Sequence, residues 1–535
     1  MKRLRARTSA FLQRLGAGWT NSHKRGVAVS PNVGALAAEK QGTLNTWRNI
    51  WRERLEAAVL TPIREFRLAY LPLLMIYFAY GALGITAVAD SFWVKLSLTL
   101  TPEDLAALGV WLTLPWTVKM VFGELVDAVP LLGSQRRAYI FLGAGMVATG
   151  LVLLAGAAGG WITFASPDTI YVLASLLTVT GVVLQDVVAD AMSTEVVART
   201  NPDGTPRDQV AVDRDLGMVQ VLGRLALSLG IFSVAWLGGY LAQVFSYETV
   251  FLIGLVVPLI SVTGAALVRL ETAAPRPVDW RLLAGGLAFG VVVTLLGVTG
   301  LPFNQEIVFV ISMTVIILML KRVVAGVDDE TRTRIFYAAV VIFAFRAVPG
   351  TGVGYQWFSI DRLGFDEAFF GVLQQIGAGI GLIAAWLLSD SITRYPIARV
   401  MLWLTILGAV LSIPNLILVH ELHLWTERVL GIGARQIAIL DTAVESPLLN
   451  ISMIPMLTLI AIYAPAGHRA TWFALMASLM NLALVAGQLM TKYLNMVFVV
   501  NRGDYVALPA LTWTAVILGL LIPLFAILRY GRWIR

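Results

Sequence analysis

The stretch QDVVADAMSTE, residues 185–195, places three carboxylates inside a long apolar segment. An ionised side chain at bilayer depth costs several kcal/mol, so Asp186, Asp190 and Glu195 need a water-facing position or a partner. The rest of the chain favours a bilayer setting: its 535 residues are 58% hydrophobic and 14% charged, whereas soluble domains are about a quarter charged. The composition therefore predicts an all-α integral membrane protein.

Segments long enough to cross a bilayer recur along the whole chain. A spanning helix needs about 20 mostly apolar residues. The sequence predicts about 14 transmembrane helices on this criterion, at 68–94, 104–129, 138–160, 169–197, 215–243, 247–268, 281–300, 304–321, 333–357, 366–389, 397–419, 432–463, 468–499 and 507–529. The seventh and eighth are joined only by GLPFN, so one re-entrant hairpin is the alternative there.

Cationic residues lie in alternate connections between these helices. Arg136 and Arg137 fall in one connection and Arg199 and Arg207 in the next but one, whereas PEDLAA and SPDT lack cations. Because Lys and Arg mark cytoplasmic loops, both termini are expected in the cytoplasm and the protein in the cell (inner) membrane. Residues 1–66 form a basic, partly amphipathic segment expected on the cytoplasmic face. Their Arg-rich, acid-poor start also resembles an organellar transit peptide, which leaves an organellar membrane as the alternative.

Carboxylate pairs recur at matching places in the two halves of the chain. QDVVAD carries Asp186 and Asp190, and LDTAVE carries Asp441 and Glu445. Each pair has i, i+4 spacing, so both members lie on one face of a helix. If the seventh and eighth helices are an insertion, each pair falls on the fourth helix of a six-helix half.

A second repeated pattern lies at the expected cytoplasmic ends of two helices. GELVDAVPLLGSQRR (123–137) and LSDSITRYPIAR (388–399) each place an Asp at a helix end and arginines shortly after it. The chain then divides into a first half at 67–269, a linker with two extra helices at 270–332 and a second half at 333–535. Two six-helix halves plus two inserted helices follow the plan of the major facilitator superfamily, with an added helix pair.

Three segments resemble the folate-biopterin transporter family. The helix-two segment, TPEDLAALGVWLTLPWTVKMVFGELVDAVPLLGSQRRAYI, matches the family signature at Pro115, Trp116, Lys119, Gly123, Asp127, Pro130, Arg136, Arg137 and Tyr139. QDVVADAMSTEVV matches at the three carboxylates quoted above, and a third segment matches at Pro455, Pro465, Gly467, Phe473, Ala474, Ser478 and Asn481. The chain departs from the family pattern at Met120, where a Pro is usual, and at His468 with Arg469.

This resemblance implies a secondary active transporter of a small organic anion such as a folate or pterin. Muropeptide permeases of the same superfamily also show a QD-x-x-x-D segment and fourteen helices, so a muropeptide-type permease is an alternative. A non-transporting membrane assembly or scaffold protein with the same fold is a third possibility. Loss of the charges inside the bundle would be expected of such a scaffold, and this chain retains them.

The charged residues inside helices are the candidate site. Buried, paired carboxylates shift towards the neutral form and can hold a proton near neutral pH, so Asp186 with Asp190 and Asp441 with Glu445 are candidate proton sites. The candidate cations for an anionic substrate are Arg346, Lys119 and Arg224. Interhelical salt bridges that only fix packing are the alternative role for all of these residues. The candidate gating residues are Asp127, Arg136, Arg137, Glu195, Asp390 and Arg394.

Other classes of function find little support in the sequence. There is no Walker sequence for ATP and no Ser-His-Asp or HExxH pattern for catalysis, so no enzyme activity and no cofactor are expected. The chain has no cysteine, and His420 with His423 lack a convincing third ligand, so no metal site is expected. The net charge of +7 gathers in particular loops and is a topology signal, not a nucleic-acid signal. The expected partners are the substrate anion, protons and the lipid bilayer.

Overall fold

The computed structural model describes residues 64–134, 136–201, 203–267, 280–299, 301–392, 396–463 and 469–534. Residues Phe66–Arg535 form one compact unit. Almost all of the basic segment expected at 1–66 lies outside the described residues. Regular structure in the described ranges is helical throughout, which confirms the all-α prediction.

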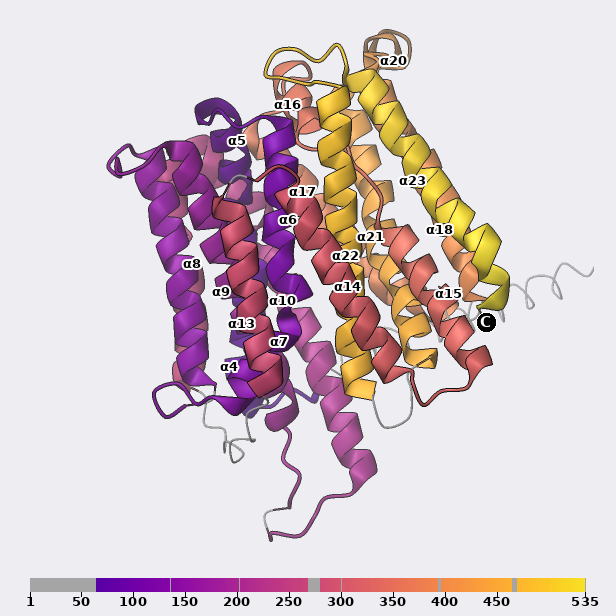
Figure 1. The fold of residues 1–535 in the computed structure, drawn as a ribbon. Coiled ribbons are helices and arrows are strands. Elements are labelled where there is room, and N and C mark those ends of the chain that lie inside the picture. The colour runs from indigo at the N-terminus through magenta and orange to yellow at the C-terminus, as the bar shows by residue number, and fades with distance from the viewer. Residues whose placement is uncertain are drawn as a thin grey trace, which may run out of the picture. The chain divides into compact units, whose positions relative to one another are not determined.

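The first half of the bundle runs from α4 to α12 (Figure 1). Three of its passes are interrupted helices, because short breaks separate α4 from α5, α6 from α7 and α11 from α12. Side chains cap the starts of α6 and α9. The Thr101 hydroxyl accepts a hydrogen bond from the backbone N–H of Asp104, and the Ser166 hydroxyl accepts one from that of Thr169. The helices are α4 (Leu71–Ala82), α5 (Ala87–Ser97), α6 (Pro102–Thr117), α7 (Lys119–Ala128), α8 (Arg137–Ala158), α9 (Pro167–Glu195), α10 (Gln209–Val244), α11 (Tyr247–Ile253) and α12 (Val256–Leu267).

Two further helices and the second half complete the unit. The inserted pair is α13 (Trp280–Val298) and α14 (Asn304–Val323). The second half comprises α15 (Asp329–Arg346), α16 (Gly354–Asp361), α17 (Glu367–Ile392), α18 (Ile397–Leu411), α19 (Ile413–Val419), α20 (His423–Leu430), α21 (Ala434–Ile462), α22 (Arg469–Val497) and α23 (Leu508–Tyr530).

Helices occupy all the ranges that the sequence predicted to span the membrane. By length and composition, ten helices of the described part could cross a bilayer. The four predicted spans outside that set are the ranges of α13, α14, α15–α16 and α21. The apolar stretch of α13 is short, at Ala284–Gly297, and residues 347–353 separate α15 from α16. Helix α14 carries charges in its first and last turns, and α21 carries charges within its length.

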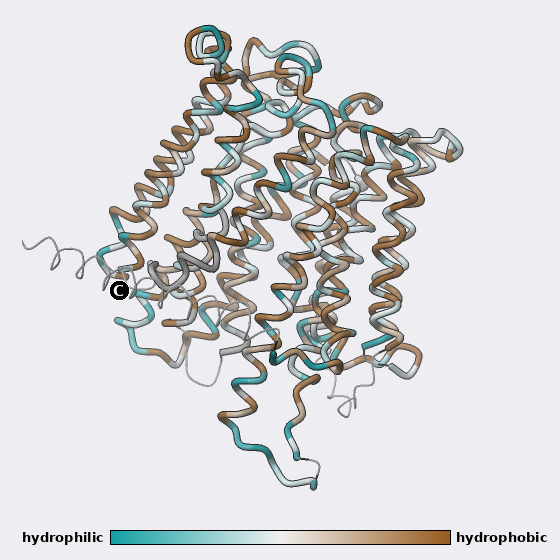
Figure 2. Tube along the Cα trace, turned by 180° about the vertical axis from the view of Figure 1, so that it is seen from behind, coloured by the Kyte–Doolittle hydropathy of each residue, from teal (hydrophilic) through white to brown (hydrophobic). Residues whose placement is uncertain are grey.

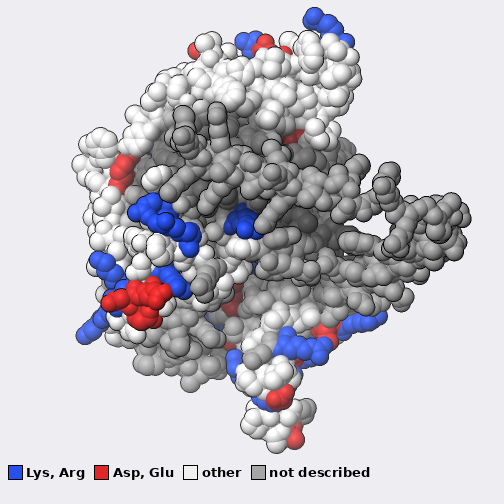
Figure 3. All heavy atoms as spheres, turned by 90° about the vertical axis from the view of Figure 1, so that its right-hand side faces the viewer, with Lys and Arg blue, Asp and Glu red and all other residues white. Residues whose placement is uncertain are grey.

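The distribution of polarity fits a protein embedded in lipid. The long helices are mainly hydrophobic in their middle portions, and hydrophilic residues gather in the connections at both ends (Figure 2). On the face shown in Figure 3, the described surface just below the charges at the top is largely uncharged, and charged residues appear again from about mid-height downward. Large apolar side chains such as Leu287, Leu318 and Phe525 are more than half exposed, as expected where lipid is the solvent.

The two halves meet through small residues and a few polar contacts. Helices α10 and α17 approach so closely that a Cβ on Gly239 would lie 2.6 Å from the Cα of Gly371, the kind of small-residue contact that membrane helices use for packing. Helix α6 packs on α22, where the Asn481 side-chain amide donates to the Trp116 carbonyl at 3.1 Å. The end of the bundle at which α5 finishes is the Lys95 end. The end at which α8 begins is the Arg136 end.

Candidate functional site

A break in the second pass positions the cation of the first carboxylate pair. Helix α6 ends at Thr117 and α7 begins at Lys119, because the backbone of Val118 leaves the helical region. The Lys119 ammonium lies 2.5 Å from a carboxylate oxygen of Asp186 and 2.6 Å from one of Asp190. The structure thus brings three predicted site residues into one cluster, with the spacing of one helical turn between the two carboxylates.

The two carboxylates of this cluster differ in their surroundings. The Asp186 side chain is 13% exposed and that of Asp190 51% exposed. The Tyr77 hydroxyl of α4 donates to the free oxygen of Asp190 at 3.1 Å. Asp186 is therefore held deep in the half, whereas Asp190 is open to exchange with water or a ligand.

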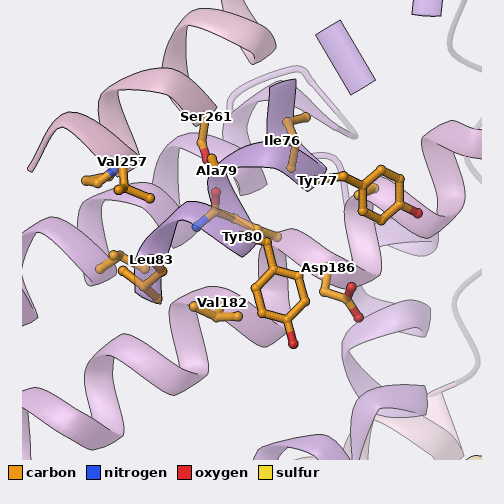
Figure 4. A pocket seen from close by; sticks show the side chains of 13 residues that line it. Ile76, Tyr77, Ala79, Tyr80, Leu83, Val182, Asp186, Val257 and Ser261 are labelled. Atoms are coloured by element: carbon orange, nitrogen blue, oxygen red, sulfur yellow. The ribbon is translucent and has the colours of Figure 1, made fainter. Parts of the chain in front are cut away.

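A small pocket adjoins the cluster but is too small for a substrate. In Figure 4, Tyr77 and Tyr80 of α4 lie on the same side of the pocket as Asp186, and Leu83 and Val257 lie on the other. Its volume is about 20 Å³, room for one water molecule at most. Any larger ligand must bind elsewhere.

A larger cavity of about 480 Å³ lies in the second half. Arg346, at the end of α15, and Glu445, on α21, both line it. The Arg346 guanidinium contacts the Met453 sulfur at 3.0 Å, and its buried Nε has no hydrogen-bond partner among the described residues. Asp441, one turn before Glu445, is buried, with one carboxylate oxygen likewise unpartnered in the described part of the chain. Glu445 therefore lines the same cavity as Arg346, and within the described part of the chain no ion pair joins either carboxylate of the second dyad to a cation.

The two dyads are thus chemically different despite their equal spacing. In the first half, Lys119 on the second pass meets the dyad. In the second half the corresponding helix, α17, contains no Lys or Arg, and it presents Gly377 to Thr442 and Ser446 of α21. Arg224, the remaining predicted cation, is exposed on α10 and acts on Asp186 electrostatically, without a direct ion pair among the described residues.

Arg136 forms ion pairs with two other predicted gating residues of the first half, Asp127 and Glu195. Its guanidinium, 7% exposed, contacts Glu195 at 2.5 and 3.0 Å and Asp127 at 2.8 Å. These contacts tie the ends of α7 and α9 to the start of α8 within one half, not across the two halves. Arg137 instead donates to the Ala265 carbonyl at the end of α12, at 3.1 Å.

The corresponding candidate residues of the second half are Asp390 and Arg394. Asp390 lies on α17, and its side chain is outside the described part of the structure. Arg394 falls in the gap between residues 392 and 396, outside the described residues. The predicted pairing of Asp390 with Arg394 stays a prediction.

Sequence reasoning missed a polar cluster that joins the two halves at the Lys95 end. Lys95 of α5, whose side chain is 6% exposed, pairs with Asp361 at the end of α16. Tyr505 donates to the other oxygen of Asp361 at 2.5 Å, and Arg502 donates to the Lys95 carbonyl at 2.6 Å while covering the Trp357 ring at 4.2 Å. The signal available in the sequence was a lysine buried near the end of an apolar helix, which requires a carboxylate partner.

The chain shares its arrangement of two helical halves with solved structures of transporters. Solved structures with the same fold include a POT family transporter in complex with 5-aminolevulinic acid, with a TM-score of 0.62 and 14% identity over 87% of this chain and 96% of that one. The peptide transporter POT in complex with sulfate gives a TM-score of 0.61 and 16% identity over 87% of this chain and 95% of that one.

The family follows from the sequence match. Residues 81–534 match the BT1 family, and the chain belongs to that family. It is 29% identical to the folate-biopterin transporter of Synechocystis sp., over 79% of this chain and 75% of the relative. It is 24% identical to the probable folate-biopterin transporter 2 of Arabidopsis thaliana, over 79% and 74% of the two chains. The resemblance expected from the three motif segments is thereby confirmed.

Proposed function

We propose that the protein is a proton-coupled secondary transporter that carries a small organic anion of the folate or pterin class by alternating access. The names of its relatives support the substrate class. The positions of Lys and Arg support an orientation with both termini in the cytoplasm of a cell membrane. In that orientation the Arg136 end faces the cytoplasm and the Lys95 end faces outward.

The observation that carries the substrate proposal is the position of Arg346. Its cavity of about 480 Å³ falls in the range of small-molecule sites, about 300–1,000 Å³. A guanidinium whose buried Nε has no partner among the described residues is a costly arrangement, and an anionic ligand would offset that cost through paired hydrogen bonds. Folates carry carboxylates on their glutamate end, which is the group we assign to Arg346.

The proton proposal rests on the cluster around Lys119. One ammonium contacts both Asp186 and Asp190, so a proton that neutralises the more exposed Asp190 leaves the ammonium paired with Asp186. Protonation therefore changes the net charge of the cluster without stranding a buried ion. Such a cluster can load and release a proton as the accessible side changes.

The contacts between the halves support alternating access. The Lys95–Asp361 pair and the Arg502 hydrogen bonds join the halves at one end, whereas the Arg136 contacts stay within one half. Among the described residues, the ion pair between the halves lies at the Lys95 end, which is the arrangement expected of a state that faces the cytoplasm. Breaking these cross-half contacts would be part of the change to the outward-facing state.

The substrate proposal is tested by comparing two ligands in binding assays on the purified protein. Loss of a charged hydrogen bond costs about 1.5–3 kcal/mol, so Arg346→Gln should weaken folate binding about 10- to 100-fold. Biopterin has no carboxylate, so its affinity should change little. Arg346→Lys should retain part of the folate affinity, and Arg332→Gln, at the exposed start of the same helix, serves as the control. Equal losses for both ligands, or no loss for either, would contradict the assignment.

A further inference from the structure

A second sizeable cavity, of about 230 Å³, lies between the inserted helices and the two halves. Its walls come from the α6–α7 break, α13, α14 and α22. On α13 the lining residues are Arg281, Gly285, Gly286 and Phe289, which span about 12 Å at the 1.5 Å rise of a helix. The cavity is therefore elongated along the helix axis.

Most of the cavity wall is apolar, and its one charged lining residue stands at one end. The apolar lining includes Val121, Val315, Ile316, Met319 and Leu475. Arg281 lies in the first turn of α13, next to Trp280, which is 72% exposed. Trp and Arg at the end of an apolar helix mark the level of lipid headgroups. The cavity thus begins at headgroup level and runs into the hydrocarbon layer.

We infer that this cavity binds one acyl chain of an anionic phospholipid, whose phosphate lies against Arg281. An elongated apolar channel fits a hydrocarbon chain, and the cation at its mouth fits a negatively charged headgroup. In the proposed orientation the Arg281 end faces the cytoplasmic leaflet. The inference rests on that part of the proposed function and on none of the substrate or proton assignments.

The position of the cavity gives the lipid a route to the transport machinery. Thr117, Val118, Met120 and Val121 line it, and Lys119, which holds Asp186 and Asp190, belongs to the same segment. A chain in the cavity would pack against this break and restrict its movement. It would also touch both halves at once, through α7 and α22.

Two glycines of α13 provide a matched pair of variants. A Cβ built on Gly285 meets nothing within 4 Å, and Gly285 lines the cavity. A Cβ on Gly290 also meets nothing within 4 Å, but Gly290 is not part of the lining. Gly285→Leu should therefore fill the cavity, whereas Gly290→Leu adds the same side chain elsewhere on the same helix.

The test measures the melting temperature of delipidated protein in detergent, with phosphatidylglycerol, phosphatidylcholine or inorganic phosphate added. Native mass spectrometry of the same samples counts the bound lipids. For the unmodified protein, phosphatidylglycerol should raise the melting temperature more than phosphatidylcholine, and inorganic phosphate alone should have no effect. Gly285→Leu should lose this phosphatidylglycerol-specific rise and one bound lipid, and Gly290→Leu should keep both.

A second pair of variants tests the headgroup contact independently of filling the cavity. Arg281→Gln should abolish the preference for phosphatidylglycerol, whereas Arg281→Lys should keep it. Equal effects of the two lipids on the unmodified protein would overturn the inference. So would an unchanged preference in Arg281→Gln, or the same response in both glycine variants. Because no substrate and no proton gradient enter these measurements, their failure would leave the transport proposal standing.

Discussion

Replacement of Asp190 by Asn removes one ionisable group and keeps the shape of the side chain. Asp190 is 51% exposed, and Lys119 retains its 2.5 Å contact with Asp186 when Asp190 is neutral. A partly exposed pair of this kind contributes about 0–1 kcal/mol to stability. Since 1 kcal/mol shifts the melting temperature of even a 150–250-residue protein by only about 2–4 °C, the variant should remain folded.

Removal of the cation from the same cluster should lower stability more than removal of one carboxylate does. Lys119→Met strands Asp186, which is only 13% exposed. Removing one partner of a buried pair costs about 3–5 kcal/mol. We therefore expect Lys119→Met to lower the melting temperature clearly more than Asp190→Asn does, so the two variants separate the packing role of the cluster from its charge.

Asp190→Asn is best assayed by thermal stability and by uptake into proteoliposomes. We expect a melting temperature within about 4 °C of the unmodified protein and loss of accumulation driven by a proton gradient. Exchange of substrate down its own gradient should persist, because exchange does not require the empty carrier to return. Asp329→Asn, at an exposed pair in the first turn of α15, is the control. A stable Asp190→Asn variant with full, pH-dependent accumulation would refute the proton role.

Three further predictions concern orientation and the ends of the helices. A reporter fused after the last residue should be cytoplasmic, and an external signal would contradict the orientation. Glu195→Gln should lower the melting temperature more than Asp127→Asn, because Arg136 donates three hydrogen bonds of 2.5, 3.0 and 3.2 Å to Glu195 and one of 2.8 Å to Asp127. Equal decreases in melting temperature would contradict this ranking. Asp361→Asn weakens the Lys95 pair and should increase labelling of cysteines introduced at that end in this cysteine-free chain; unchanged labelling would exclude a closing role.

Local spacing explains which parts of the site could be expected from the sequence. Asp186 and Asp190 share a helix face because four residues make about one turn, and the helix itself follows from its apolar length. The all-α fold and the two halves with an inserted pair rest on the same two signals. Lys119 was a candidate as a lone charge in an apolar helix, but its place between the two carboxylates depends on the break at Val118.

Contacts between distant segments could not be derived in this way. Lys95 and Asp361 are 266 residues apart, and no periodicity relates a helix end of one half to a helix end of the other. The equal spacing of the two carboxylate pairs suggested equal chemistry, yet only the first pair meets a lysine. That difference was already present in the sequence, because α17 contains no Lys or Arg. The close approach of Gly377 to α21, by contrast, depends on packing in three dimensions.

The central claim is proton-driven transport of an anionic pterin or folate, and the most direct measurement is folate uptake by proteoliposomes that contain only this protein. An inwardly directed proton gradient should drive folate above its equilibrium concentration inside the vesicles. A protonophore should abolish that accumulation while leaving exchange intact. Accumulation that is insensitive to the protonophore would contradict the proton coupling. Absence of any folate or pterin movement in vesicles that contain folded protein would contradict the transport proposal itself.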